Sequence, residues 1–130
     1  MGRAFQLLGA LAGVVGVALG AFGAHGLEGR LSPEMLDVFE TAVRYHLYHA
    51  LALLATAAIL ARLPSSRLVT AAGWAFLAGI VLFSGSLYLL ALTGARGLGA
   101  ITPLGGIAFL VGWALLAIAA TKGPVVGRQL

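Results

Sequence analysis

The sequence predicts an all-α integral membrane protein, an up-down-up-down four-helix bundle with both termini cytoplasmic. Hydrophobic residues make up 61% of the 130 residues and charged residues 9%, whereas a soluble domain carries about 25% charged residues. Four apolar stretches are long enough to cross about 30 Å of hydrocarbon at about 1.5 Å per residue. The connections between them are mostly short, so consecutive helices are expected to be antiparallel neighbours within one domain, residues 1–130.

The first expected span covers residues 4–24. A signal peptide is disfavoured because this apolar run exceeds the usual length of about 7–15 residues, and cleavage after Ala24 would leave bulky Phe22 where a small residue is needed. Glycines recur along the span at alternating intervals of four and three residues, which places them on one helix face. Such a stripe lets another helix approach closely, either in the same bundle or in another subunit. It consists of Gly9, Gly13, Gly16, Gly20 and Gly23.

The second expected span covers residues 41–61, after an amphipathic helix start at 33–40 that is expected to lie in the membrane interface. Ser32 can cap this helix, and Pro33 suits its first position. Acidic side chains in the first turns complement the positive end of the helix dipole. The sequence therefore predicts a well-defined helix start shortly after the first loop.

The third and fourth expected spans cover residues 68–92 and 102–121. Each must be helical, because lipid offers no hydrogen-bond partners to the backbone. The small residues Ser84 and Ser86 lack the surroundings of a nucleophile elbow, so they favour close helix packing. The fourth helix is expected to start like the second, with Thr102 as its N-cap and Pro103 in the first position.

The distribution of charge predicts the orientation of the bundle. One end carries only basic side chains, while the other carries all four acids together with Arg30 and Arg96. Cytoplasmic loops of membrane proteins are enriched in lysine and arginine, so we expect both termini on the cytoplasmic side of an inner or plasma membrane. The basic side chains on the expected cytoplasmic side are Arg3, Arg62, Arg67, Lys122 and Arg128.

The residue inventory disfavours several functions. The chain has no cysteine, which excludes thiolate metal ligands and a cysteine nucleophile. Its acids all lie between residues 28 and 40, and the phosphate-binding P-loop pattern is absent. Basic residues are few and flank apolar runs, without the clusters that bind nucleic acid. We therefore expect a protein that is not an enzyme, has no catalytic residue or cofactor, and does not bind nucleic acid.

Polar side chains from several helices fall at similar depth, in the half of the bundle nearest the first loop. Ionisable groups in membrane spans are costly and usually face the bundle interior or a water-filled cavity. The leading hypothesis is therefore a polar pocket for a small molecule, an ion or a lipid head group. Its expected lining residues are His25, Arg44, His49, Ser84, Ser86 and Tyr88.

Other interpretations of these residues stay open. Arg44 can pair with Glu40 one turn earlier, either as an interfacial anchor or as part of an anion site. His25, His46 and His49 are weak candidates for a three-histidine metal site, and His25 with His49 for axial haem ligation. Hydrogen bonding across helices is the simplest role for these histidines, and proton relay is a further one.

Several segments together resemble a known family across nearly the whole chain. They are Gly20 to Leu27 (GAFGAHGL), Phe39 to Leu51 (FETAVRYHLYHAL), Phe83 to Leu89 (FSGSLYL), and Ile101 to Gly106 (ITPLGG) followed by Gly112 and Trp113. The chain resembles the small four-helix membrane proteins of the family named domain of unknown function 423, which are similar to eukaryotic transmembrane protein 256.

The resemblance implies an integral membrane protein without an established activity. His46 stands where this family often has glutamine, a poor metal ligand, which argues against the three-histidine site. The residues that match the family pattern are His25, Glu40, Thr41, Tyr45, Tyr48, His49, Ser84, Ser86, Thr102 and Pro103.

Two further functional hypotheses accompany the binding pocket. One is a structural or assembly subunit that packs through the glycine stripe of the first span. The other is a metal or haem redox protein built on the histidines. The expected partners are membrane lipid and either a second copy of the chain or another membrane protein.

Overall fold

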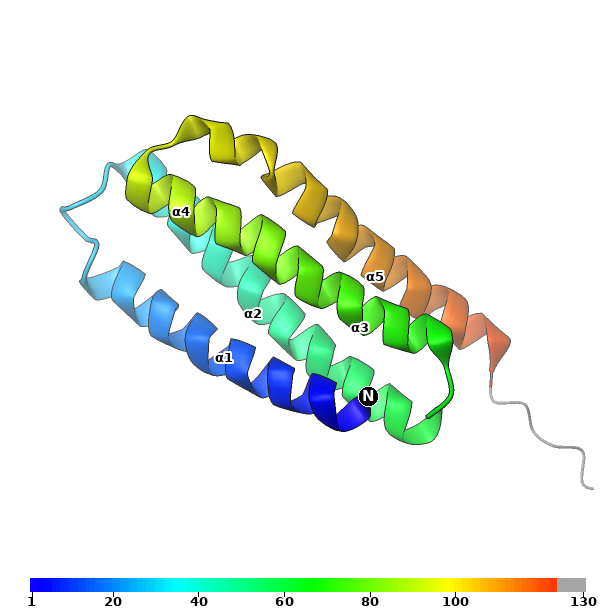
Figure 1. The fold of residues 1–130 in the computed structure, drawn as a ribbon. Helices are drawn as coiled ribbons and strands as arrows, with labels where there is room; N and C mark the ends of the chain where they lie inside the picture. Colours follow the sequence, from blue (N-terminus) through cyan, green and yellow to red (C-terminus); the bar gives the residue numbers. More distant parts are fainter. Residues whose placement is uncertain (124–130) are drawn as a thin grey trace, which may run out of the picture.

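The computed structural model describes residues 1–123 as long helices joined by short connections (Figure 1). The all-α prediction is confirmed, and within these residues four helical segments are long and apolar enough to cross a membrane. The elements are α1 (Gly2–His25), α2 (Pro33–Arg62), α3 (Arg67–Gly79), the π-helical turn η1 (Ile80–Ser84), α4 (Gly85–Thr93), the 3₁₀ turn η2 (Arg96–Ala100) and α5 (Thr102–Lys122).

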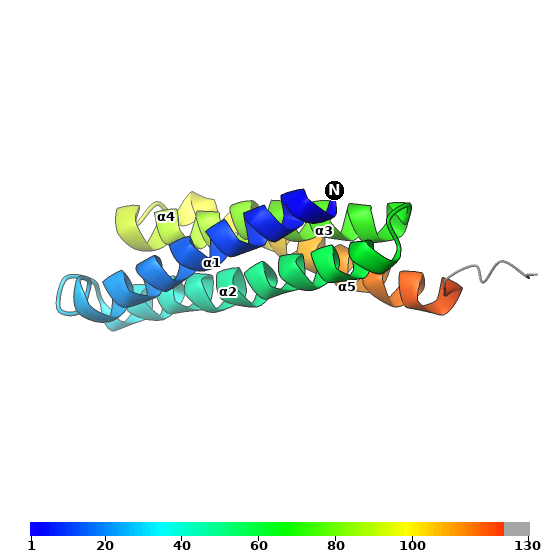
Figure 2. The same cartoon turned by 90° about the horizontal axis from the view of Figure 1, so that it is seen from below.

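Consecutive long helices run antiparallel, with α3, η1 and α4 forming one continuous segment (Figures 1 and 2). The start of α1, the α2–α3 connection and the end of α5 lie together at what we call the terminal end of the bundle. The opposite end, which carries the α1–α2 connection and η2, is called the loop end. This arrangement fits the expected topology. Which end faces the cytoplasm stays a prediction, and Arg128, one of the charges used for it, lies outside the described residues.

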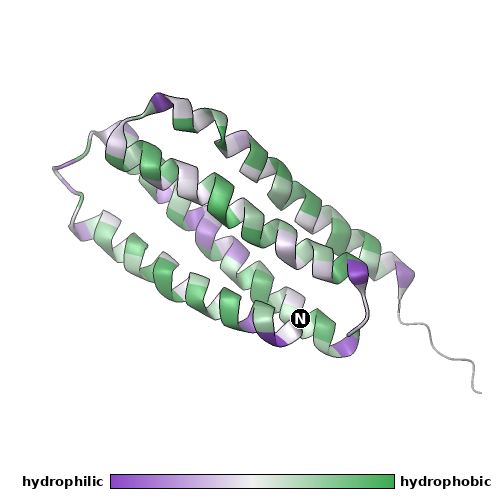
Figure 3. Ribbon diagram, in the orientation of Figure 1, coloured by the Kyte–Doolittle hydropathy of each residue, from purple (hydrophilic) through white to green (hydrophobic). Residues whose placement is uncertain are grey.

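The two middle segments are the more buried ones. α1 packs mainly against α2, and α5 packs mainly against α3 and η1, so α1 and α5 flank the bundle. Hydrophilic residues concentrate at the two ends and along the first half of α2, while apolar residues cover most of the remaining helix length (Figure 3). This distribution is the one expected of a bundle that spans lipid.

The glycine stripe of α1 faces α2 of the same chain. A Cβ atom added at Gly9, Gly16, Gly20 or Gly23 would come within 2.6 to 3.2 Å of α2 atoms, whereas one at Gly13 would meet nothing within 4 Å. The absence of side chains therefore brings the two helices of one chain together. The alternative hypothesis, in which this stripe is a surface for a partner protein, conflicts with this position because α2 already covers most of it.

The start of α2 agrees with the sequence-based prediction. Ser32 has an extended backbone, and its Oγ accepts a hydrogen bond from the backbone N–H of Met35 at 3.2 Å. The expected interfacial segment at 33–40 and the span at 41–61 form a single helix of 30 residues. Consequently the side chains of both parts share one continuous helical register.

The prediction that Thr102 caps the last helix is wrong. η2 leads directly into α5, and the preceding residue Ile101 already has helical backbone angles (φ −81°, ψ −33°). Thr102 is thus the first residue within α5, and no side chain caps this helix. Its hydroxyl instead forms a 2.6 Å hydrogen bond with the hydroxyl of Ser86 in α4. Thr102 therefore joins two helices.

Candidate functional site

The imidazole of His49 is buried, and both of its ring nitrogens are hydrogen-bonded. Nδ1–H donates to the backbone carbonyl of Tyr45 at 2.6 Å, and Nε2 accepts from the indole N–H of Trp113 at 3.1 Å. Because an indole nitrogen can only donate, these two bonds fix the proton on Nδ1. The ring also stacks on Phe109, with ring centroids 3.5 Å apart and planes inclined by 9°. His49 thus connects α2 to α5 by a hydrogen bond and by stacking.

His46 is likewise buried, on an adjacent face of α2. Its Nδ1 is hydrogen-bonded to the hydroxyl of Tyr88 in α4 at 2.8 Å. The Tyr88 ring in turn packs against Phe39, with centroids 5.1 Å apart. This pair therefore ties α4 to α2 toward the loop end.

The two serines of the third span also make specific hydrogen bonds. Ser84, the last residue of η1, is fully buried and donates to the backbone carbonyl of Ala42 in α2 at 2.8 Å. Ser86 is bonded to Thr102, as described above. Within residues 1–123, every buried side-chain nitrogen or oxygen has a hydrogen-bond partner. The inner polar residues thus satisfy one another.

The six expected pocket residues separate into two groups. His49, Ser84, Ser86 and Tyr88 lie inside the bundle and bond to neighbouring helices, whereas His25 and Arg44 are exposed. A single polar pocket lined by all six residues is therefore not formed. The inner group holds helices together, and only Arg44 of the six lines the groove described below.

A difference in depth explains the position of His25. His46 lies level with Gly16 of α1, since its Cδ2 is 3.4 Å from the position of a Cβ added there. His25 ends α1 nine residues later, a rise of about 13 Å at 1.5 Å per residue. The predicted meeting of His25 with the histidines of α2 is therefore wrong.

The three imidazoles consequently do not converge on one metal ion. In the described part of the chain, no group of three or more His, Cys, Asp or Glu side chains is arranged to hold a metal. The weak candidate pair for axial haem ligation, His25 with His49, is not formed either, because His25 is exposed at the helix end and His49 Nε2 is engaged by Trp113. The redox hypothesis therefore has no structural support in these residues.

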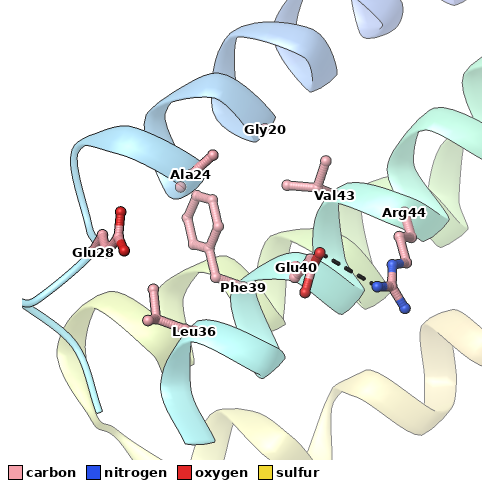
Figure 4. A pocket seen from close by; sticks show the side chains of 9 residues that line it. Gly20, Ala24, Glu28, Leu36, Phe39, Glu40, Val43 and Arg44 are labelled. Atoms are coloured by element: carbon pink, nitrogen blue, oxygen red, sulfur yellow. Dashed lines mark ion pairs between the residues drawn. The ribbon is translucent and has the colours of Figure 1, made fainter. Parts of the chain in front are cut away.

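A groove lies at the loop end, between the last turns of α1 and the first turns of α2 (Figure 4). It has a volume of about 460 Å³. Its floor is apolar, and its rim carries two carboxylates and one guanidinium. The lining residues are Gly20, Gly23, Ala24, Glu28, Leu36, Phe39, Glu40, Val43 and Arg44.

The charged residues of the rim are solvated. Arg44 Nη2 lies 3.3 Å from Glu40 Oε1, and the two side chains are 60% and 62% exposed. An ion pair this exposed contributes about 0–1 kcal/mol, so either partner can engage another charge at little cost. Glu28 extends from the α1–α2 connection toward the same groove (Figure 4).

The sequence predicts the pairing of Glu40 with Arg44, which the structure forms, but Glu28 was missed as a member of this site. Helical spacing gives a usable signal, because Glu40 and Arg44 share a face of α2 with Leu36. What spacing alone does not provide is the position of α1, which forms the other wall of the groove.

Comparison with known proteins gives the family. Residues 19–106 match the family model described as "Protein of unknown function (DUF423)". The UPF0382 membrane protein YwdK of Bacillus subtilis is 52% identical over 120 residues, covering 92% of this chain and 98% of that protein. A UPF0382 membrane protein of Staphylococcus epidermidis is 51% identical, covering 92% of this chain and 97% of that protein.

No solved structure matches this chain. Its relatives are named as bacterial membrane proteins, which agrees with the four candidate spans and indicates the cell membrane. The chain therefore belongs to the DUF423 family of membrane proteins, whose UPF0382 members are about half identical to it over most of its length.

Proposed function

We propose that this membrane protein binds a phospholipid with a primary ammonium head group in the groove between α1 and α2, and that this role is not enzymatic. One observation carries the proposal, namely an apolar cavity of about 460 Å³ whose rim bears side chains of both charges. Phosphatidylethanolamine combines the matching parts, which are acyl chains, a phosphate and a primary ammonium.

The floor of the groove suits an acyl chain. Leu36, Phe39 and Val43 of α2 form its apolar surface, and Gly20, Gly23 and Ala24 of α1 form the opposite wall, where no side chain is larger than a methyl group. Apolar contact of this kind contributes about 25 cal/mol per Å² of apolar surface removed from water. For a lipid that is already in a bilayer this gain in free energy is smaller, because its acyl chains are already out of water. Selectivity among lipids therefore depends on the head group.

The rim provides a contact for each charge of the head group. Glu28 and Glu40 offer carboxylates to an ammonium with three N–H donors, while the Arg44 guanidinium suits a phosphate. The Glu40–Arg44 pair is well exposed, so exchange of partners requires little free energy. Because carboxylates outnumber cations on this rim, a zwitterionic lipid with an ammonium group is favoured over an anionic one.

The charge distribution also supports a location for the site. The loop end carries all four acids, and the positive-inside tendency directs this end away from the cytoplasm. In the proposed arrangement the lipid belongs to the outer leaflet of the cell membrane. The buried histidines then support the walls of the site, through hydrogen bonds between helices, and do not contact the ligand.

Native mass spectrometry of the protein released from lipid–detergent mixtures tests the proposal. We expect phosphatidylethanolamine to be retained more than phosphatidylcholine, which lacks N–H donors, and more than phosphatidylglycerol, which lacks the ammonium. Ala24→Leu places a larger side chain in the groove and should remove this preference. Ala21→Leu on the exposed surface of the same helix is the matched control and should keep it.

Equal retention of the three lipids by the unmodified protein would contradict the proposal. If the preference for phosphatidylethanolamine survives Ala24→Leu as well as Ala21→Leu, the lipid does not bind in the groove between α1 and α2. Replacement of the rim charges separates the two contacts. Glu28→Gln should weaken the discrimination between phosphatidylethanolamine and phosphatidylcholine, whereas Arg44→Gln should weaken retention of both.

A further inference from the structure

The terminal end of the bundle has the opposite electrostatic character. Arg3, Arg62, Arg67 and Lys122 are all exposed there. No acid accompanies them, because all four acids of the chain lie between residues 28 and 40. Within the described residues, four cationic side chains therefore share this end without an acidic side chain to neutralise them.

Two of these cations face one depression. It has a volume of about 400 Å³ and lies between the end of α2, the α2–α3 connection and the end of α5. Arg62 contributes from α2 and Lys122 from α5, while Ser65 lies on the connection between α2 and α3. Apolar surface comes from Leu68 and Ala119. A phosphodiester matches the cations and the hydroxyl, and acyl chains match the apolar part.

Helix ends alone do not account for this arrangement. A cation in the last turn of a helix complements the negative end of the dipole, which is a sufficient reason for Arg62 or Lys122 separately. Both nevertheless line one cavity. An anion bound there is attracted by two cations at once.

We propose that this depression binds the phosphodiester of an anionic phospholipid such as phosphatidylglycerol. The phosphate lies between the Arg62 guanidinium and the Lys122 ammonium, and the acyl chains extend toward Leu68 and Ala119. An ammonium-bearing head group gains no contact with an acidic side chain here, because all four acidic side chains lie between residues 28 and 40. The proposal is independent of the groove at the loop end and predicts the opposite lipid preference.

Trp74 provides a local reporter. It lines a neighbouring depression that shares Pro64, Ser65 and Ser66 with the proposed site. The chain has two tryptophans, so Trp113→Phe leaves Trp74 as the only one. Fluorescence of this variant in phosphatidylcholine vesicles then measures how closely a brominated lipid approaches the terminal end.

At equal mole fraction, brominated phosphatidylglycerol should quench Trp74 more than brominated phosphatidylcholine does. The double replacement Arg62→Gln and Lys122→Gln should reduce this quenching to the phosphatidylcholine level. Arg96→Gln, which removes an exposed cation at the loop end, is the control and should leave the difference intact. Equal quenching by both lipids, or an unchanged difference in the double variant, overturns the proposal.

Two additions make the test complete. Inorganic phosphate added to the vesicles should not reduce the quenching, because it lacks acyl chains, and displacement by phosphate would overturn the assignment to lipid.

Since Trp113 is bonded to His49, the Trp113→Phe background can fail to fold. In that case native mass spectrometry compares phosphatidylglycerol retention by the otherwise unmodified protein and by the Arg62/Lys122 double variant. Lower retention by the double variant is expected, and equal retention by the two overturns the proposal.

Discussion

Trp113 of α5 donates its indole N–H to Nε2 of His49 in α2 across 3.1 Å. Because α5 otherwise packs mainly against α3 and η1, this bond is a direct connection between α5 and α2. The same imidazole stacks on Phe109, so one buried side chain holds two residues of α5. We therefore expect His49 to have a mainly structural role.

Replacement of His49 by alanine should be strongly destabilising. The variant loses the stacking on Phe109 and leaves the Trp113 indole without its acceptor, for an expected cost of about 2–4 kcal/mol. The matched control is His25→Ala, since His25 is exposed, and its effect should stay within about 0.5 kcal/mol. Thermal unfolding of the detergent-solubilised variants measures the stability of both. Similar losses of stability in His49→Ala and His25→Ala would contradict a structural role for His49.

The hydroxyl of Tyr88 is expected to contribute separately. Tyr88→Phe keeps the ring contact with Phe39 but removes the hydrogen bond to His46, at a cost of about 1–2 kcal/mol. Tyr48 is 57% exposed and makes no side-chain hydrogen bond within the described residues, so Tyr48→Phe should be close to neutral. Unfolding in a denaturing detergent series compares the two, and equal stability of both variants would show that the His46–Tyr88 bond contributes nothing.

Two adjacent glycines of α5 should differ sharply in their tolerance of alanine. A Cβ at Gly105 would collide with the backbone of Phe83 in η1, whereas one at Gly106 would meet only the Phe83 ring, at 3.8 Å or more. Gly105→Ala should therefore cost about 1–3 kcal/mol. Gly106→Ala should change stability by less than about 1 kcal/mol, in the stabilising direction, because alanine is the better helix former. Melting temperatures that fall equally would contradict the close approach of α5 to η1.

The glycine stripe of α1 allows a similar comparison. A Cβ at Gly9 would lie 3.0 Å from the carbonyl oxygen of Ala50 and one at Gly13 would meet nothing within 4 Å. Gly9→Ala should thus destabilise the chain by about 1–2 kcal/mol, and Gly13→Ala should not. Size-exclusion chromatography of the same variants addresses assembly. If Gly13→Ala alone changes the oligomeric state, this position lies in an interface between subunits.

Residue patterns alone predict most of the fold. The spans follow from the lengths of the apolar runs, which can be counted along the chain and compared with the bilayer thickness. The Ser32 cap depends only on neighbours within one turn. The contact between His49 and Trp113 is not local, and counting residues from the outer ends of the second and fourth spans does not single it out, because Phe109 and Leu110 lie nearer to the depth of His49.

The π-helical turn and the groove were not predictable in this way. The hydropathy of a segment does not change when its backbone hydrogen bonds switch from the α-helical pattern (four residues apart) to the π-helical pattern (five residues apart). The turn η1 lies where Gly105 of α5 closely approaches Phe83. The groove likewise depends on how the last turns of α1 lie against the first turns of α2, a property of two helices and their connection. Both features therefore arise from packing between elements, which a single sequence does not specify by its periodicity.

The turn η1 also sets the rotational phase of the segment from Arg67 to Thr93. Each residue advances a helix by about 100°, so the extra residue of a π turn rotates everything after it by that amount. Both α3 and α4 pack against α2, whereas α5 packs extensively against α3 and η1 and little against α4. Deleting one residue from Ile80–Ser84 would leave a hydrophobic span of nearly the same length, with Ser86 and Tyr88 turned away from Thr102 and His46. The number of residues in this span, as well as their polarity, is therefore under constraint.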